Sequence, residues 1–217
     1  MTAAPAPPVR PARTSGRLRR TLSASAVVAF VVTGILTLFG GATSAVRAAA
    51  GEADLWLPAA PADAPPVARL SPRLSSDGYS LVHVGVSGVS PESLAVHTAV
   101  LLTGYVLIAG VAFFLAYLSW RFWTARPLAR GVVVGLGICS GALMVFSAAA
   151  PLLFTLAHRQ IFAELAVDLA AAPFSAVDTF GLDDAVLFFA GLSLGLLALA
   201  LAAVRSLADG GDGPDRP

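Results

Sequence analysis

The stretch that decides the fold is GVVVGLGICSGALMVFSAAAPLLFTLAH, residues 131–158. It contains no Asp, Glu, Lys or Arg, although 12% of the residues in the whole chain are charged. An α-helix rises about 1.5 Å per residue and the hydrocarbon core of a bilayer is about 30 Å thick, so about 20 apolar residues cross it. A charge at the centre of such a helix would cost about 2.5 to 3.5 kcal/mol. The stretch is therefore long and apolar enough to span a membrane.

Three further stretches share this property, and 57% of the residues are hydrophobic, which is above the level of soluble domains. Because lipid offers no partners to backbone polar groups, each stretch must be helical. The sequence predicts an all-α integral membrane protein with transmembrane helices at residues 21–46, 93–120, 131–157 and 185–204. The remaining segments are a disordered basic tail at 1–20, an outer loop at 47–92, a basic loop at 121–130, a second outer loop at 158–184 and a disordered tail at 205–217.

Local signals indicate where some of the helices begin. Residues 90–92, Ser-Pro-Glu, supply an N-cap, a proline in the first turn and an acid at the positive helix end. Asp183 and Asp184 are placed in the same way before the fourth span. Pro151 lies inside the third apolar stretch, and the sequence leaves open whether it kinks that helix or marks its exit.

The arginines indicate the orientation. Ten of the fourteen arginines lie in the two tails and the basic loop, at residues 1–20, 121–130 and 205–217. These segments alternate along the chain with two other loops, at 47–92 and 159–184, which hold the remaining four arginines together with ten acidic residues. Because loops rich in Arg stay in the cytoplasm, we expect a multi-pass membrane protein with both termini cytoplasmic.

The basic loop at 121–130 has aromatic residues beside its arginines. Tyr117, Trp120 and Trp123 suit an aromatic belt at the headgroup layer. The simplest interpretation is that these residues only fix the orientation of the chain in the membrane. The alternative is that the arginines bind an anionic lipid headgroup or an acidic partner. The candidate residues for such a contact are Arg121, Arg126 and Arg130.

The first apolar stretch allows a second topology. Basic residues before it and small residues at 43–45 also fit a secretory signal peptide. Cleavage would leave three spans, and their orientation would be unchanged.

The two outer loops carry weaker signals. A turn at 75–78 precedes YSLVHVGV at 79–86, which favours a hairpin over residues 67–86 with 67–74 as the partner strand. In the second loop, polar residues recur about every four positions, which predicts a short interfacial helix from about 159 to 170.

GLSLG at 191–195 matches the G-x-S-x-G pattern of serine hydrolases, but it lies in an unbroken apolar run rather than at a turn between a strand and a helix. We interpret it as a pair of small residues that lets helices approach closely. Six glycines form such pairs: Gly131 with Gly135, Gly137 with Gly141, and Gly191 with Gly195.

The titratable residues give no recognised site. The histidines and outer acids show no metal-ligand spacing, so we expect no metal, no cofactor and no catalytic residues. A net charge of +1 and the lack of a basic stripe argue against a nucleic-acid partner.

The layout of four spans around one short basic loop resembles a bacterial family of membrane proteins known only as a domain of unknown function. In that family, an aromatic and hydroxyl pair and then an Asn precede the basic residues. Trp123 and Thr124 match the pair and residues 126–130 the basic part, whereas Pro127 falls where the Asn is expected. The resemblance implies a location in the bacterial cytoplasmic membrane and assigns no site residues.

These observations favour a non-catalytic accessory, sensing or regulatory membrane component. Its expected partners are the lipid bilayer and either another membrane protein or further copies of the chain. The alternative is a small membrane enzyme or transport subunit with a site at the outer ends of the spans, around His97, His158 and Glu164.

Overall fold

The computed structural model describes residues 14–59, 81–124, 130–170, 172, 174–178 and 181–210. It is mostly helical, and its four helices are each long and apolar enough to cross a membrane, as the sequence predicts. The elements are α1 (Thr14–Ala49), β1 (Ala53–Pro58), β2 (Leu81–Val86), α2 (Pro91–Trp123), α3 (Arg130–Glu164) and α4 (Leu182–Gly210).

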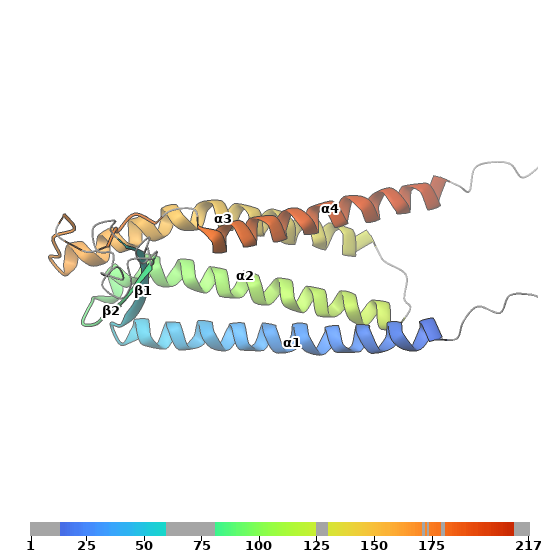
Figure 1. The fold of residues 1–217 in the computed structure, drawn as a ribbon, viewed down its shortest axis with the longest axis horizontal. Coiled ribbons are helices and arrows are strands. Elements are labelled where there is room, and N and C mark those ends of the chain that lie inside the picture. Colours follow the sequence, from blue (N-terminus) through green and yellow to red (C-terminus); the bar gives the residue numbers. More distant parts are fainter. Residues whose placement is uncertain are drawn as a thin grey trace, which may run out of the picture.

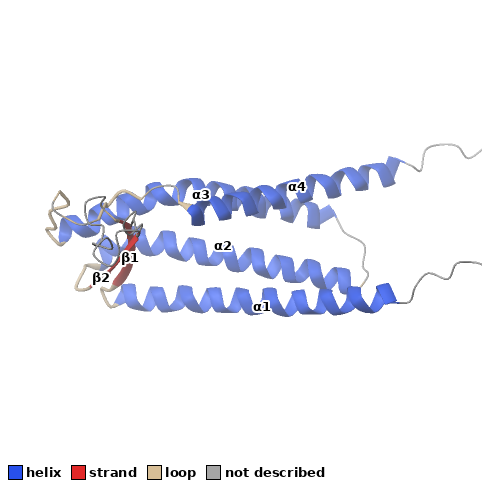
Figure 2. Ribbon diagram, viewed as in Figure 1, coloured by secondary structure: helices blue, strands red, loops and turns tan. Residues whose placement is uncertain are grey.

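The four helices lie side by side, and the two strands cover one end of them (Figures 1 and 2). Extensive helix contacts join neighbours in the sequence, so that α1 packs on α2, α2 on α3, and α3 on α4. We call the end with the strands the capped end. We call the other end, where α2 finishes near Arg121 and α3 starts at Arg130, the arginine end.

Capping at the start of α2 follows the sequence prediction. Ser90 is the N-cap residue and accepts a hydrogen bond from the Ser93 amide at 3.3 Å, with Pro91 and Glu92 in the first turn. At the capped end of α1, Gly51 has a φ of 75° and lets the Glu52 amide donate to the Arg47 carbonyl at 2.9 Å. This turn leads α1 directly into β1.

Pro151 lies inside α3, and the helix continues past it to Glu164. The helix therefore does not end at Pro151, because a proline in a long apolar helix does not end it when neighbouring helices support the backbone. The separate interfacial helix expected from about 159 to 170 is wrong. Residues 159–164 are the last turns of α3, which closes where Ala166 has a φ of 52° and the Val167 amide donates to the Phe162 carbonyl at 3.1 Å.

The strands form an antiparallel pair whose register runs from Ala53 opposite Val86 to Pro58 opposite Leu81. The strand expected at 79–86 is present as β2, but its described partner is β1, and residues 67–74 lie outside the described residues. Strand β1 was not predicted from the sequence, although ADLWLP, residues 53–58, shows the alternation of a half-buried strand. Ala53, Leu55 and Leu57 are buried and Trp56 is exposed, as in a half-buried strand.

One apolar core fixes the strands to the helix ends. Leu55 and Leu57 of β1 are buried in the same cluster as Leu94 of α2 and Ile161 of α3. The chain before α4 joins this assembly, since the Ser175 amide donates to the Pro58 carbonyl at 2.8 Å. We call the two strands together with residues 174–178 the cap.

Candidate functional site

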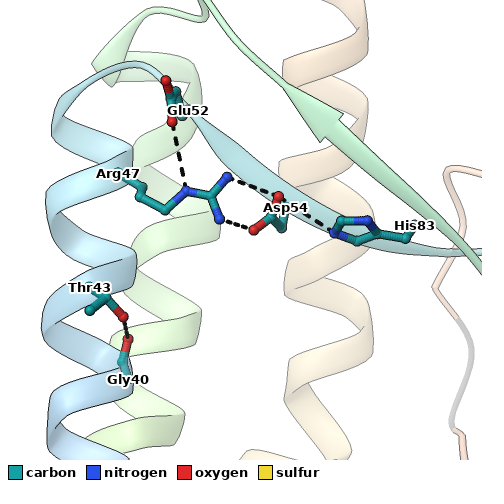
Figure 3. Close-up of polar contacts among 6 residues, drawn as sticks. All are labelled: Gly40, Thr43, Arg47, Glu52, Asp54 and His83. Atoms are coloured by element: carbon teal, nitrogen blue, oxygen red, sulfur yellow. Dashed lines mark hydrogen bonds and ion pairs between the residues drawn. The ribbon is translucent and has the colours of Figure 1, made fainter.

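A network of charged side chains links the end of α1 to the cap (Figure 3). The Arg47 guanidinium donates two hydrogen bonds to Asp54, one of them from Nη2 to Oδ1 at 3.0 Å. Its Nε lies 3.7 Å from Glu52, and His83 on β2 lies 3.5 Å from Asp54. The Arg47 side chain, first by its hydrogen bonds and then by its charge, holds the pKa of Asp54 below the usual carboxyl value. These charges are therefore arranged to satisfy one another.

Beneath this network lies a cavity of about 220 Å³ between α1, α2 and β1. Charged groups lie on its α1 and β1 sides, whereas α2 contributes an imidazole, a leucine and a phenol. Its walls are Ser44, Arg47 and Ala48, then Glu52, Ala53, Asp54 and Trp56, and finally His97, Leu101 and Tyr105.

His97, in the wall of this cavity, is only 4% exposed. Neither of its ring nitrogens has a hydrogen-bond partner among the residues that the structure describes. Buried polar groups in folded proteins are nearly always paired with protein, water or a ligand. An unpaired imidazole beside a cavity therefore indicates that something else supplies its partner.

His158 lies next to His97 on the neighbouring helix. The two ring centroids are 5.7 Å apart, and Phe154 lies within 5.9 Å of both. His158 is 2% exposed, and its Nδ1 has no partner within the described part of the chain. The structure thus brings together two of the three residues around which the alternative site was expected.

Glu164, the third of those residues, is engaged elsewhere. Its carboxylate accepts hydrogen bonds from the amide and the hydroxyl of Ser90, both at 2.8 Å. It therefore ties the end of α3 to the start of α2, where a carboxylate also meets the positive end of the helix dipole.

The described residues contain no group of three or more His, Cys, Asp and Glu side chains that could hold a metal ion. Ser193, the serine of the G-x-S-x-G match, donates its hydroxyl to the Phe189 carbonyl at 2.8 Å, one turn earlier in α4. No imidazole contacts it among the described residues, so the observed role of this hydroxyl is a bond within its own helix.

Two of the three candidate contact residues at the arginine end lie within the described part of the chain. Arg121 donates to the Tyr117 hydroxyl at 2.8 Å, and its guanidinium lies 5.6 Å from the centre of that ring. Arg130 is exposed at the start of α3, and Arg126 lies outside the described residues. Trp120 and Trp123 pack edge to face with centroids 5.0 Å apart.

The six glycines divide into two groups. A Cβ built at Gly191 would lie 3.0 Å from the Ser140 carbonyl oxygen, and one at Gly195 would lie 2.7 Å from the Ser140 hydroxyl, so both lie against α3. A Cβ at Gly135 would lie 2.6 Å from the Phe114 ring of α2. The other three would meet no heavy atom within 4 Å: Gly131, Gly137 and Gly141.

Most of the cavity wall was not predicted from the sequence. Arg47 immediately follows the first apolar stretch, and acids follow at 52 and 54, a spacing that could have indicated a salt-bridged helix end. The close approach of α1 to α2 was not predicted either. It occurs at Gly34, which faces Phe113, and at Gly40 and Gly41, which face Tyr105. These contacts join residues more than 60 positions apart, so no local pattern identifies them.

Comparison with protein-family models, with curated proteins and with solved structures finds no match to this chain. What it does must therefore be inferred from its own residues.

Proposed function

We propose that this protein is a non-catalytic sensing or regulatory component of the bacterial cytoplasmic membrane. Both termini lie in the cytoplasm, and the cap faces outward. The orientation is supported by the arginines, ten of which lie in the tails and in the loop at the arginine end. The four-span layout is also the one that resembles the bacterial family of unknown function.

The observation that carries this proposal is the apolar core shared by the cap and the helix ends. Leu57 in the cap, Leu94 of α2 and Ile161 of α3 are each at most 1% exposed and belong to one cluster. A tightly packed core transmits displacement rather than absorbing it. A molecule that binds the cap would therefore change the positions of α2 and α3 within the membrane.

The alternative, a small membrane enzyme or transport subunit, is favoured by a different observation. His97 and His158 come from two helices, their ring centroids are 5.7 Å apart, and both are buried near the capped ends of candidate spans. Ionisable groups in such positions often belong to functional sites. In this alternative, His158 and Glu164 would act together with His97.

A complementation experiment separates the two functions. A strain that lacks the protein is supplied with the parent chain or with His158→Leu, Glu164→Gln or the double variant Arg47→Gln/Asp54→Asn, and membrane levels are matched by immunoblot. Gln at 164 keeps an oxygen that accepts from Ser90, and Leu at 158 keeps most of the buried volume.

A sensing component should tolerate His158→Leu and Glu164→Gln. It should lose its response in the double variant, because that variant removes the ion pair that links the end of α1 to β1. Loss of the phenotype in both His158→Leu and Glu164→Gln, with normal amounts in the membrane, would support the enzyme or transport subunit instead.

A further inference from the structure

The cavity beneath the cap has two kinds of polar group in its wall. The charged groups are already paired, since Arg47 binds Asp54 and lies 3.7 Å from Glu52. The uncharged hydroxyls are not paired, because neither Ser44 nor Tyr105 has a hydrogen-bond partner among the residues that the structure describes. A charged ligand would have to break the ion pairs, whereas an uncharged one would use the free groups.

His97 provides an independent indication of a ligand. Its imidazole is 96% buried, lines the cavity and lacks a partner for either nitrogen in the described part of the chain. A neutral imidazole carries one donor and one acceptor. Together with the hydroxyls of Ser44 and Tyr105, it gives the cavity three N–H or O–H donors and no unpaired charge.

The rest of the wall is apolar or aromatic. The Trp56 indole, the Tyr105 ring and the Leu101 side chain line the same space of about 220 Å³. Binding sites for small molecules commonly combine such surfaces with a few placed hydrogen-bonding groups. A flat ring whose oxygens face the donors would match both parts of the wall.

We propose that this cavity binds a small uncharged ring that carries carbonyl oxygens, the chemistry of a quinone head group. Its oxygens accept hydrogen bonds from His97, Tyr105 and Ser44, and its ring packs against Trp56 and Leu101. The inference deepens the proposed sensing function, for which it supplies the molecule that is sensed. Such a ring could come from a membrane quinone with a long tail or from a tail-free compound outside the membrane.

The three tryptophans allow a direct measurement of binding, because only Trp56 lies at the capped end. The purified full chain with Trp120→Phe and Trp123→Phe is titrated with duroquinone, which has no tail, and with decylplastoquinone. We expect saturable quenching of Trp56 fluorescence. A Trp56→Phe protein, which keeps the two tryptophans of the arginine end, reports the quenching caused by quinone dissolved in the detergent.

The test of His97 uses two matched variants in the same background. His97→Leu removes the imidazole from the cavity wall, and His158→Leu removes the neighbouring imidazole, which is not part of the wall. We expect His97→Leu to weaken quinone binding about tenfold, the effect of losing one good hydrogen bond, and His158→Leu to leave it within about twofold. A thermal melt of each variant establishes that it is folded.

Tighter binding of decylplastoquinone than of duroquinone, after correction with the Trp56→Phe protein, would identify a membrane quinone as the source. Equal binding would identify a tail-free compound. The proposal is overturned if neither quinone quenches Trp56 saturably, or if folded His97→Leu binds as well as the parent. Because this experiment uses purified protein, its failure would not affect the complementation test of the sensing function.

Discussion

The two ends of the same four helices are built in different ways. At the capped end, strands and helix termini share a core in which Leu55, Leu57 and Ile161 are at most 1% exposed. At the arginine end, the side chains of Trp120 and Phe122 are about half exposed, at 45% and 51%. The capped end joins strands and helices in one core with buried polar groups. The arginine end carries exposed aromatic and basic residues beside a smaller buried cluster of the helices alone, which includes Leu118, Val132 and Leu136.

This difference reflects how each end meets its surroundings. Aromatic and basic side chains at a membrane surface are stabilised by the headgroup layer and need few protein contacts. A cap that projects beyond the lipid must instead bury its own apolar residues. For this reason we propose ligand recognition at the capped end and membrane anchoring at the arginine end.

The largest effect should come from opening the core of the cap. Leu57→Ala removes a side chain that is 0% exposed and should lower the free energy of unfolding by about 2 to 5 kcal/mol. Trp56→Ala is the matched control, because Trp56 is the adjacent residue of β1 and is 61% exposed. Thermal melts in detergent check the prediction, and equal losses in the two variants would show that the cap has no such core.

A second effect concerns the membrane-embedded region between the two ends. Gly191→Leu places a side chain against the backbone of Ser140 and should destabilise the protein by about 1 to 3 kcal/mol through overpacking. Gly141→Leu is the control, since a Cβ there meets nothing within 4 Å. If Gly141→Leu proves the more damaging change, the contact between α3 and α4 is assigned to the wrong faces.

The sequence alone predicts the helices better than the cap. Charge-free stretches and the residues Ser90, Pro91 and Glu92 mark the spans because lipid and helix termini impose local rules. The cap depends on pairing Ala53–Pro58 with Leu81–Val86 and on the approach of His97 to His158. Such contacts depend on how distant segments pack, and hydrophobic periodicity does not encode them.

The smallest effect should be the part of the pH dependence that arises from Asp54 in the cap. Arg47 holds the pKa of Asp54 below its ordinary value, so the charged carboxylate favours the folded state. This stabilisation is fully present above the ordinary carboxyl pKa of about 4 and is lost as the pH falls through the lowered folded-state pKa. Asp54→Asn should therefore destabilise the protein slightly at neutral pH and remove that part of the acid sensitivity, as measured by melts across a pH series. An unchanged pH profile in Asp54→Asn would mean that Arg47 does not stabilise the charged form.

The most direct test of the account is a topology map, because its central claim is that the cap faces outward and the arginine end faces the cytoplasm. Reporters that are active on only one side of the membrane are fused after Gly51, Thr124, Ala172 and Pro217. The account predicts that they read outside, inside, outside and inside. A reporter after Thr124 that reads outside would contradict it, because the arginine end would then lie on the side assigned to the cap.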